Sequence, residues 1–155
     1  MSAPSAPSPR EAAWLDQGYR PWPAAGGFLP AIARLFQRED GAHLRFRVDL
    51  GPAHCNGHGR VHGGFIATLA DVWLAGNLAR RLPPEACFVT AGLQVDYLGA
   101  VAAGDWLESE MDWVRVGGQL CHAAGRIRAG DGRLVGAMRG SFVRVGAPGC
   151  RAAGR

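Results

Sequence analysis

The pattern of apolar and polar positions predicts a chain of strands built around one long helix. From His43 to Leu50 the two kinds of residue alternate strictly, which is typical of a strand buried on one face. The segment Ala31 to Arg38 is also rich in apolar residues. A turn signal, Glu39-Asp40-Gly41, separates the two segments. Together they predict a hairpin.

The segment from His62 to Arg81 is the long helical candidate. Between Phe65 and Leu78 the polar side chains are those of Thr68, Asp71 and Asn77. A helix that is apolar on nearly all sides is a buried helix rather than a surface one. Two arginines suit the negative end of its dipole, and a Pro-Pro pair then stops it.

Four further strands are expected after this helix, over residues 88–98, 106–116, 120–128 and 133–145. In the first of them, alternation places one set of residues on a common face: Val89, Ala91, Leu93, Val95 and Tyr97. The predicted order is a hairpin, one helix and a four-strand meander. This is an α+β fold with an antiparallel sheet wrapped around one long central helix. A single sheet leaves the far face of the helix open, which favours a dimer.

Composition indicates one globular domain over residues 13–145. The chain has 155 residues, 48% apolar and 19% charged. Residues 1–12 and 146–155 are rich in Ser, Ala, Pro, Gly and Arg, so both ends are expected to be disordered tails. No run approaches the roughly 18 apolar residues of a membrane span. The N-terminus also lacks the apolar core of a signal peptide, so we expect a cytoplasmic protein without a membrane partner.

The basic balance carries little information about partners. The net charge is +4, and all 17 basic residues are arginine. Without the two tails, 14 arginines and 12 acidic residues remain. No basic stripe with interleaved aromatic residues is present, so nucleic acid is not an expected partner. The four cysteines show no metal-binding spacing, and no metal or organic cofactor is expected.

The chemistry-bearing residues cluster between His54 and Asp71. A carboxylate in the middle of an apolar helix either pairs with a neighbour such as Arg60 or acts as a general base or nucleophile. His62-Gly63-Gly64 lies at the start of the helix. Its glycines either belong to an ordinary loop or leave backbone N–H donors open to a substrate carbonyl. Asn56 is either an Asx turn or a further donor.

Together these residues resemble the PaaI-type hotdog-fold acyl-CoA thioesterases. The family pattern has Asn, two variable residues, Gly, two more, then HGG, with an acidic residue nine positions after the His. This chain matches it with Asn56, Gly59, His62-Gly63-Gly64 and Asp71. The order of predicted elements also matches, so the resemblance covers about residues 28–145.

The resemblance implies a role for each matching residue. The N–H of Gly63 would polarise the thioester carbonyl with help from the side chain of Asn56. Asp71, from the helix of a second subunit, would activate water or attack the thioester. Thr90 would position the water, and His62 would shape the helix start. The implied assembly is a homodimer, or a dimer of dimers, acting on acyl-CoA without a cofactor.

Basic and aromatic residues are the candidates for substrate contacts. Arginines suited to the CoA phosphates are Arg60, Arg80, Arg81, Arg115, Arg126 and Arg128. Four aromatic residues either line a pocket for an aromatic acyl group or pack in the hydrophobic core: Phe65, Trp73, Phe88 and Tyr97. The remaining histidines fit surface or core positions better than a metal site. They are His54, His58 and His122.

Two other functions compete with the hydrolase. A hotdog module that binds acyl-CoA or an acyl-carrier protein without turnover would keep the same fold, but the full set of motif residues argues against it. A hotdog dehydratase would need a different Asp/His arrangement, which the sequence does not contain. A serine hydrolase is not indicated, because no GxSxG elbow is present.

Overall fold

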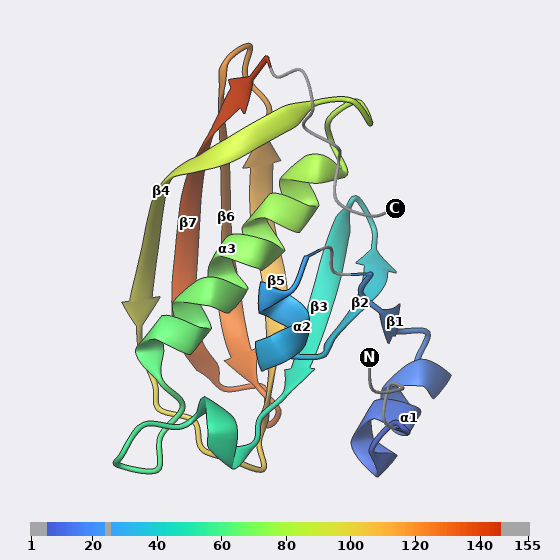
Figure 1. Cartoon of the computed structure of the whole chain (residues 1–155), viewed down its shortest axis with the longest axis vertical. Coiled ribbons are helices and arrows are strands. Elements are labelled where there is room, and N and C mark those ends of the chain that lie inside the picture. The colour runs from blue at the N-terminus through green and yellow to red at the C-terminus, as the bar shows by residue number, and fades with distance from the viewer. Residues whose placement is uncertain (1–5, 24–25, 147–155) are drawn as a thin grey trace.

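The structure, a computed structural model, describes residues 6–23 and 26–146. One antiparallel sheet packs against one long helix, α3, which crosses it diagonally (Figure 1). The elements are α1 (Pro9–Asp16), β1 (Arg20–Pro21), α2 (Phe28–Ile32), β2 (Leu35–Asp40), β3 (His43–Asp49), the 3-10 turn η1 (Pro52–His54), α3 (Gly63–Ala79), β4 (Cys87–Tyr97), β5 (Trp106–Arg115), β6 (Leu120–Ala129) and β7 (Leu134–Val145). None of the described helices is long and apolar enough to cross a membrane.

The seven strands lie in the order β1-β2-β3-β5-β6-β7-β4. The predicted hairpin is confirmed as β2 and β3, but the predicted four-strand meander is wrong for its first strand. β5 pairs with β3, so β4 is displaced to the far side of β7 and becomes an edge strand. Residues 98–105 carry the chain back across the sheet. The α+β hotdog architecture is confirmed: the sheet curves around one helix (Figure 1).

A β-bulge in β4 breaks the alternation expected along that strand. The register with β7 shifts between Thr90 and Gly92, so that Ala91 is the extra residue. Thr90 pairs opposite Phe142 and Leu93 opposite Gly140, two positions apart on β7. Thr90 and Leu93 therefore share a face, which strict alternation would forbid. The bulge thus turns Thr90 toward the helix side of the sheet, together with Leu93, Val95 and Tyr97, and moves Val89 to the other side.

Helix α3 is the centre of the core, as its apolar composition predicts. Its buried residues are Ile66, Leu69, Ala70, Trp73, Leu74, Gly76, Asn77 and Leu78. The helix touches β3, β4, β5, β6 and β7. At Gly76 a Cβ would come within 2.9 Å of the Phe46 ring, so the missing side chain lets helix and sheet approach closely.

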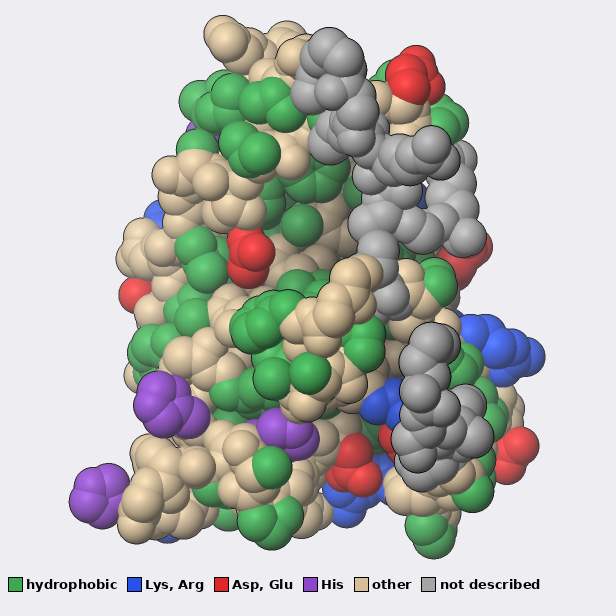
Figure 2. Space-filling view, in the orientation of Figure 1, with side chains coloured by type: hydrophobic (Ala, Val, Ile, Leu, Met, Phe, Trp, Pro, Cys, Tyr) green, Lys and Arg blue, Asp and Glu red, His purple; other side chains and the backbone are tan. Residues whose placement is uncertain are grey.

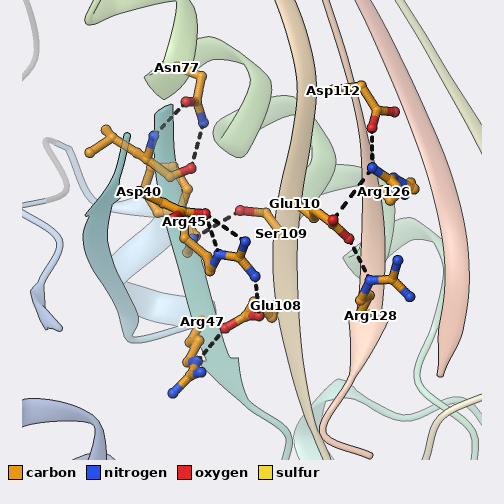
Figure 3. A network of polar contacts seen from close by, with 12 residues as sticks. Asp40, Arg45, Arg47, Asn77, Glu108, Ser109, Glu110, Asp112, Arg126 and Arg128 are labelled. Atoms are coloured by element: carbon orange, nitrogen blue, oxygen red, sulfur yellow. Dashed lines mark hydrogen bonds and ion pairs between the residues drawn. The ribbon is translucent and has the colours of Figure 1, made fainter. Parts of the chain in front are cut away.

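One buried polar side chain fixes α3 to the sheet. Asn77 accepts a hydrogen bond from the N–H of Leu44 at 2.7 Å and donates to its carbonyl at 3.0 Å (Figure 3). It also donates to the carbonyl of Trp73 at 3.0 Å. All three bonds are buried, so they set the position of the helix along β3 as well as stabilising it.

The N-terminal segment folds against the opposite face of the sheet. The expected disordered tail over residues 1–12 is wrong from Pro9 onward, where α1 begins with a capping box between Ser8 and Glu11. Trp14 of α1 is buried with Tyr19 and Phe36 in a second apolar cluster. The rest of that expectation, residues 1–5 and 147–155, lies outside the described residues. The strand expected from residue 31 also begins later, because 28–32 form α2.

A buried carboxylate ties this segment to the strands. Glu108 accepts hydrogen bonds from Arg45, Arg47 and the hydroxyl of Tyr19 at 2.9, 2.5 and 2.8 Å (Figure 3 shows the two arginines). Burial alone would raise the pKa of Glu108, but these bonds hold it below its ordinary value. Glu108 thus joins β3 and β5 to Tyr19 on the outer face of the sheet.

Replacing Asn77 with Ala is expected to lower the free energy of unfolding by about 2 kcal/mol, because the buried N–H of Leu44 loses its acceptor. Urea denaturation followed by circular dichroism measures the change. The matched control is Gln119→Ala at an exposed turn, expected within about 0.5 kcal/mol of the parent chain. Equal stability of the two variants would contradict the anchoring role.

Candidate functional site

The loop before α3 is closed by a single asparagine side chain. The Oδ1 atom of Asn56 accepts from the N–H groups of His58 at 2.9 Å and Arg60 at 3.2 Å. Gly59 has φ +70°, a conformation that favours glycine, and its N–H donates to the carbonyl of Asn56 at 3.0 Å. The Asx-turn interpretation of Asn56 therefore holds for its oxygen. Its Nδ2 group makes no hydrogen bond within residues 6–23 and 26–146, so it remains available as a donor.

His62 is the N-cap of α3. Its Nδ1 atom accepts a hydrogen bond from the N–H of Gly64 at 2.9 Å. A Cβ at Gly64 would lie 3.1 Å from that same nitrogen, which explains a glycine there. The ring thus satisfies one exposed donor of the helix start, as its expected structural role requires.

The N–H of Gly63 is left open by this cap. It is the first residue of α3, so it has no acceptor inside the helix, and it makes no hydrogen bond to any other described residue. It lies at the positive end of the 17-residue helix. An open N–H in that field is the kind of donor that stabilises a developing oxyanion.

Asp71 and Thr90 come together, as both were expected to belong to one site. The hydroxyl of Thr90 donates to Oδ1 of Asp71 at 2.8 Å. Asp71 is half-buried on α3 and Thr90 is exposed on β4. The alternative of an Asp71–Arg60 pair is not what the structure shows: within the described residues no arginine contacts this carboxylate. The carboxylate is therefore oriented by one hydroxyl and open to a further ligand.

The open N–H and the carboxylate of one chain are far apart. Gly63 and Asp71 are separated by eight residues of one helix. Eight residues span about 12 Å along the axis and turn about 80° around it. The N–H would meet a carbonyl oxygen at about 3 Å, and the carboxylate would act on the carbonyl carbon directly or through one water. Within one chain the two groups lie about two helical turns apart.

Tyr97 takes part in the site in a way that sequence reasoning missed. Its hydroxyl donates to the carbonyl of Gly63 at 2.8 Å. The sequence assigned it only to an acyl pocket or the core, yet it is half-exposed. The bulge in β4 decides on which face Thr90 lies, and Gly92 inside the strand pattern is a local signal that could have indicated it.

The other candidate residues fall into two groups. Ion pairs occupy three of the candidate arginines: Arg80 with Glu39, Arg126 with Glu110 and Asp112, and Arg128 with Glu110. The other three make no ion pair within the described ranges: Arg60, Arg81 and Arg115. Histidines gather on the helix-bearing face, beside the loop that precedes α3 (Figure 2). In the described part of the chain, no three His, Cys, Asp or Glu side chains are grouped as metal ligands.

Comparison with known proteins identifies relatives of this chain. The profile of the Thioesterase superfamily matches residues 58–136, which contain Gly63, Asp71, Thr90 and Tyr97. A protein of Pseudomonas aeruginosa named "Putative esterase PA0474" is 33% identical over 131 residues, covering 83% of this chain and 96% of that protein.

Solved structures share the fold. The E. coli PaaI protein from the phenylacetic acid degradation operon superposes with a TM-score of 0.63 at 22% identity, over 73% of this chain and 80% of that one. The BH2602 protein of Bacillus halodurans, solved with CoA, superposes with a TM-score of 0.61 at 30% identity, over 65% of this chain and 66% of that one.

His62→Ala is expected to lower the free energy of unfolding by about 1 kcal/mol, because the N–H of Gly64 loses its cap. His62→Asn, which keeps a capping acceptor, should restore most of the loss. Urea denaturation of the three proteins at pH 8 measures both changes. A His62→Ala protein as stable as the parent would mean that the cap is not structural.

Proposed function

Because the chain belongs to the thioesterase superfamily, we propose that it hydrolyses an acyl-CoA thioester to a carboxylic acid and free CoA. The neighbours named thioesterases support a thioester hydrolase. The observation that carries the proposal is that one helix presents both a carboxylate, Asp71, held by Thr90 and an open N–H at Gly63. These are the two groups that hydrolysis of an acyl group requires.

The proposed reaction uses these two groups together with the hydroxyl of Thr90 and the side-chain amide of Asn56. Asp71 takes a proton from a water held by Thr90, and the water oxygen bonds to the thioester carbon. The carbonyl oxygen becomes an oxyanion that accepts from the N–H of Gly63 and from Nδ2 of Asn56. Collapse of this intermediate breaks the C–S bond, and CoA leaves as its thiolate, which takes up a proton. Direct attack by the Asp71 carboxylate, followed by hydrolysis of the anhydride, uses the same two groups.

A second copy of the chain completes the proposed site. The Gly63-to-Asp71 distance along one helix is too long for one carbonyl, so the N–H comes from one subunit and the carboxylate from another. β4 is an 11-residue edge strand with one unpaired side, and three of its apolar side chains are exposed. They are Val89, Leu93 and Tyr97 at 53%, 38% and 53%. Antiparallel pairing of two β4 strands would set two α3 helices side by side in opposite directions.

The two-fold symmetry of such a dimer matches the chemistry. In an isologous pair each contact occurs twice, so Gly63 of one chain beside Asp71 of the other gives two equal sites. Hydrophobic side chains over the helix-bearing face supply the surface that this association would cover (Figure 2). A dimer of dimers would repeat the arrangement without changing either site.

Arg60 is the arginine best placed to meet the CoA phosphates. It is exposed at the end of the turn closed by Asn56, two residues before His62. Its guanidinium makes no ion pair to the described residues, whereas Arg80, Arg126 and Arg128 are already paired. The CoA in the BH2602 structure supports a CoA thioester as the ligand class.

Asp71→Asn is expected to lower kcat by at least about a hundredfold for acyl-CoA hydrolysis, because the amide cannot accept the proton of the attacking water. A free-thiol assay across phenylacetyl-CoA, benzoyl-CoA and straight-chain acyl-CoAs measures the rate. The control is Asp112→Asn, an exposed carboxylate on β5, which should keep the parent rate.

Two outcomes would contradict this account. Parent-like turnover by Asp71→Asn would remove Asp71 from the mechanism. Stabilisation of the parent chain by acyl-CoA in a thermal-shift assay, with no thiol released from any ester, would instead identify a binding module.

A further inference from the structure

The peptide that joins Gly63 to Gly64 is held at both ends. Its carbonyl accepts from the hydroxyl of Tyr97 at 2.8 Å. Its N–H donates to Nδ1 of His62 at 2.9 Å. A hydrogen-bond chain therefore runs from a phenol on β4, through one peptide, to the imidazole that caps α3.

We propose that Tyr97 is a positioning residue for the oxyanion donor, acting through this peptide on the adjacent N–H of Gly63. The inference rests on the proposed thioester hydrolysis. The Gly63 N–H belongs to the His62–Gly63 peptide, whose carbonyl accepts from the N–H groups of Phe65 and Ile66 at 3.0 and 3.2 Å. The next peptide joins two glycines, which have no side chains to limit their backbone angles. The Tyr97 hydroxyl and the His62 ring hold that second peptide, so they restrain Gly63 from its other side.

The phenol ring adds a second restraint. A Cβ placed on Gly63 would lie 3.4 Å from two ring atoms of Tyr97, so the ring lies directly against the first residue of the helix. The ring thus covers one side of Gly63, while the hydroxyl holds its carbonyl. A Phe at this position keeps the contact and loses the hydrogen bond.

One strand then positions both halves of the chemistry. Thr90 holds Asp71, and Tyr97, seven residues later on β4, holds the peptide beside the oxyanion donor. Both face α3 because the bulge at Ala91 restores a common face across an odd spacing. Without the bulge, residues 90 and 97 would point to opposite sides of the sheet.

The test is Tyr97→Phe in the full-length protein, with steady-state kinetics on an acyl-CoA that the parent hydrolyses. We expect kcat to fall about tenfold and KM to change less than about twofold, because the lost bond matters most when charge develops on the carbonyl oxygen. The matched control is Tyr19→Phe, the chain's other tyrosine, which is buried against Glu108. It should lose thermal stability and keep kcat.

A spectroscopic readout separates positioning from loss of structure. In an Asp71→Asn background, the C=O stretch of a bound acyl-CoA thioester should lie below its frequency in water, because the Gly63 N–H polarises it. Adding Tyr97→Phe should move the stretch back toward the value in water. Amide exchange at Gly64, followed by NMR without ligand, should quicken in Tyr97→Phe and not in Tyr19→Phe.

The failures of the two proposals are distinguishable. Unchanged kcat, C=O frequency and Gly64 exchange in Tyr97→Phe would overturn the role of Tyr97 while leaving hydrolysis intact. A fall in kcat that Tyr19→Phe reproduces would show a general loss of structure and overturn it as well. Absence of thiol release by the parent would instead overturn the proposed function, and Gly64 exchange would still decide whether Tyr97 holds the peptide.

Discussion

The spacing of two groups on one rigid helix is the constraint on which the site depends. α3 holds an open N–H at Gly63 and a carboxylate at Asp71, eight residues on. A buried helix has no freedom to shorten that separation of about 12 Å. Asn77 fixes the helix along β3 from inside the core, and Gly76 lets it lie close to Phe46. The same packing that stabilises the fold therefore sets the geometry of the chemistry.

Strand β4 lies beside α3 and provides both the contacts to its two groups and a free edge. It is the edge strand, so one of its sides is free to pair, and its bulge turns Thr90 and Tyr97 toward the same helix. Thr90 contacts Asp71 in the middle of α3, and Tyr97 contacts Gly63 at its start. In the proposed dimer, this strand would therefore connect the assembly of two chains with the completion of the site. The opposite end of the sheet, covered by α1 and the Glu108 network, contributes stability instead.

The elements that sequence analysis predicted are those with a strong local signal. The apolar run from 65 to 78 identified the buried helix, and strict alternation identified β3. The position of β4 was missed because strand order depends on which partners other strands leave free, and no local pattern encodes this. The start of α1 carried a usable signal, the Ser8-to-Glu11 capping box, which the surrounding prolines and alanines obscured.

The candidate site shows the same division. The spacing of Asn56, His62-Gly63-Gly64 and Asp71 indicated this loop and helix start, where the turn at Asn56 and the cap at His62 are local contacts. A place for Thr90 in the same site came from the family resemblance alone, and its bond to Asp71 was not predicted. The contact of Tyr97 with Gly63 was not predicted either, because it joins residues 34 positions apart.

The central claim is that one site uses Gly63 from one chain and Asp71 from another, and subunit complementation tests it most directly. Gly63→Pro removes the N–H, and proline suits the first helical position because His62 already has the extended backbone that precedes proline. The added Cβ would lie 3.4 Å from the Tyr97 ring, an ordinary van der Waals contact. The Gly63→Pro variant and the Asp71→Asn variant are co-expressed with different tags, and complexes that carry both tags are purified. In the control, each single variant is co-expressed with a chain that carries both substitutions.

Each variant alone should be nearly inactive. The doubly tagged dimer should recover about half of the parent rate, because one of its two symmetric sites keeps both wild-type groups. The control pairs should recover nothing. A doubly tagged species no more active than its inactive parents, or the absence of any such species, would contradict a site shared between two copies of the chain.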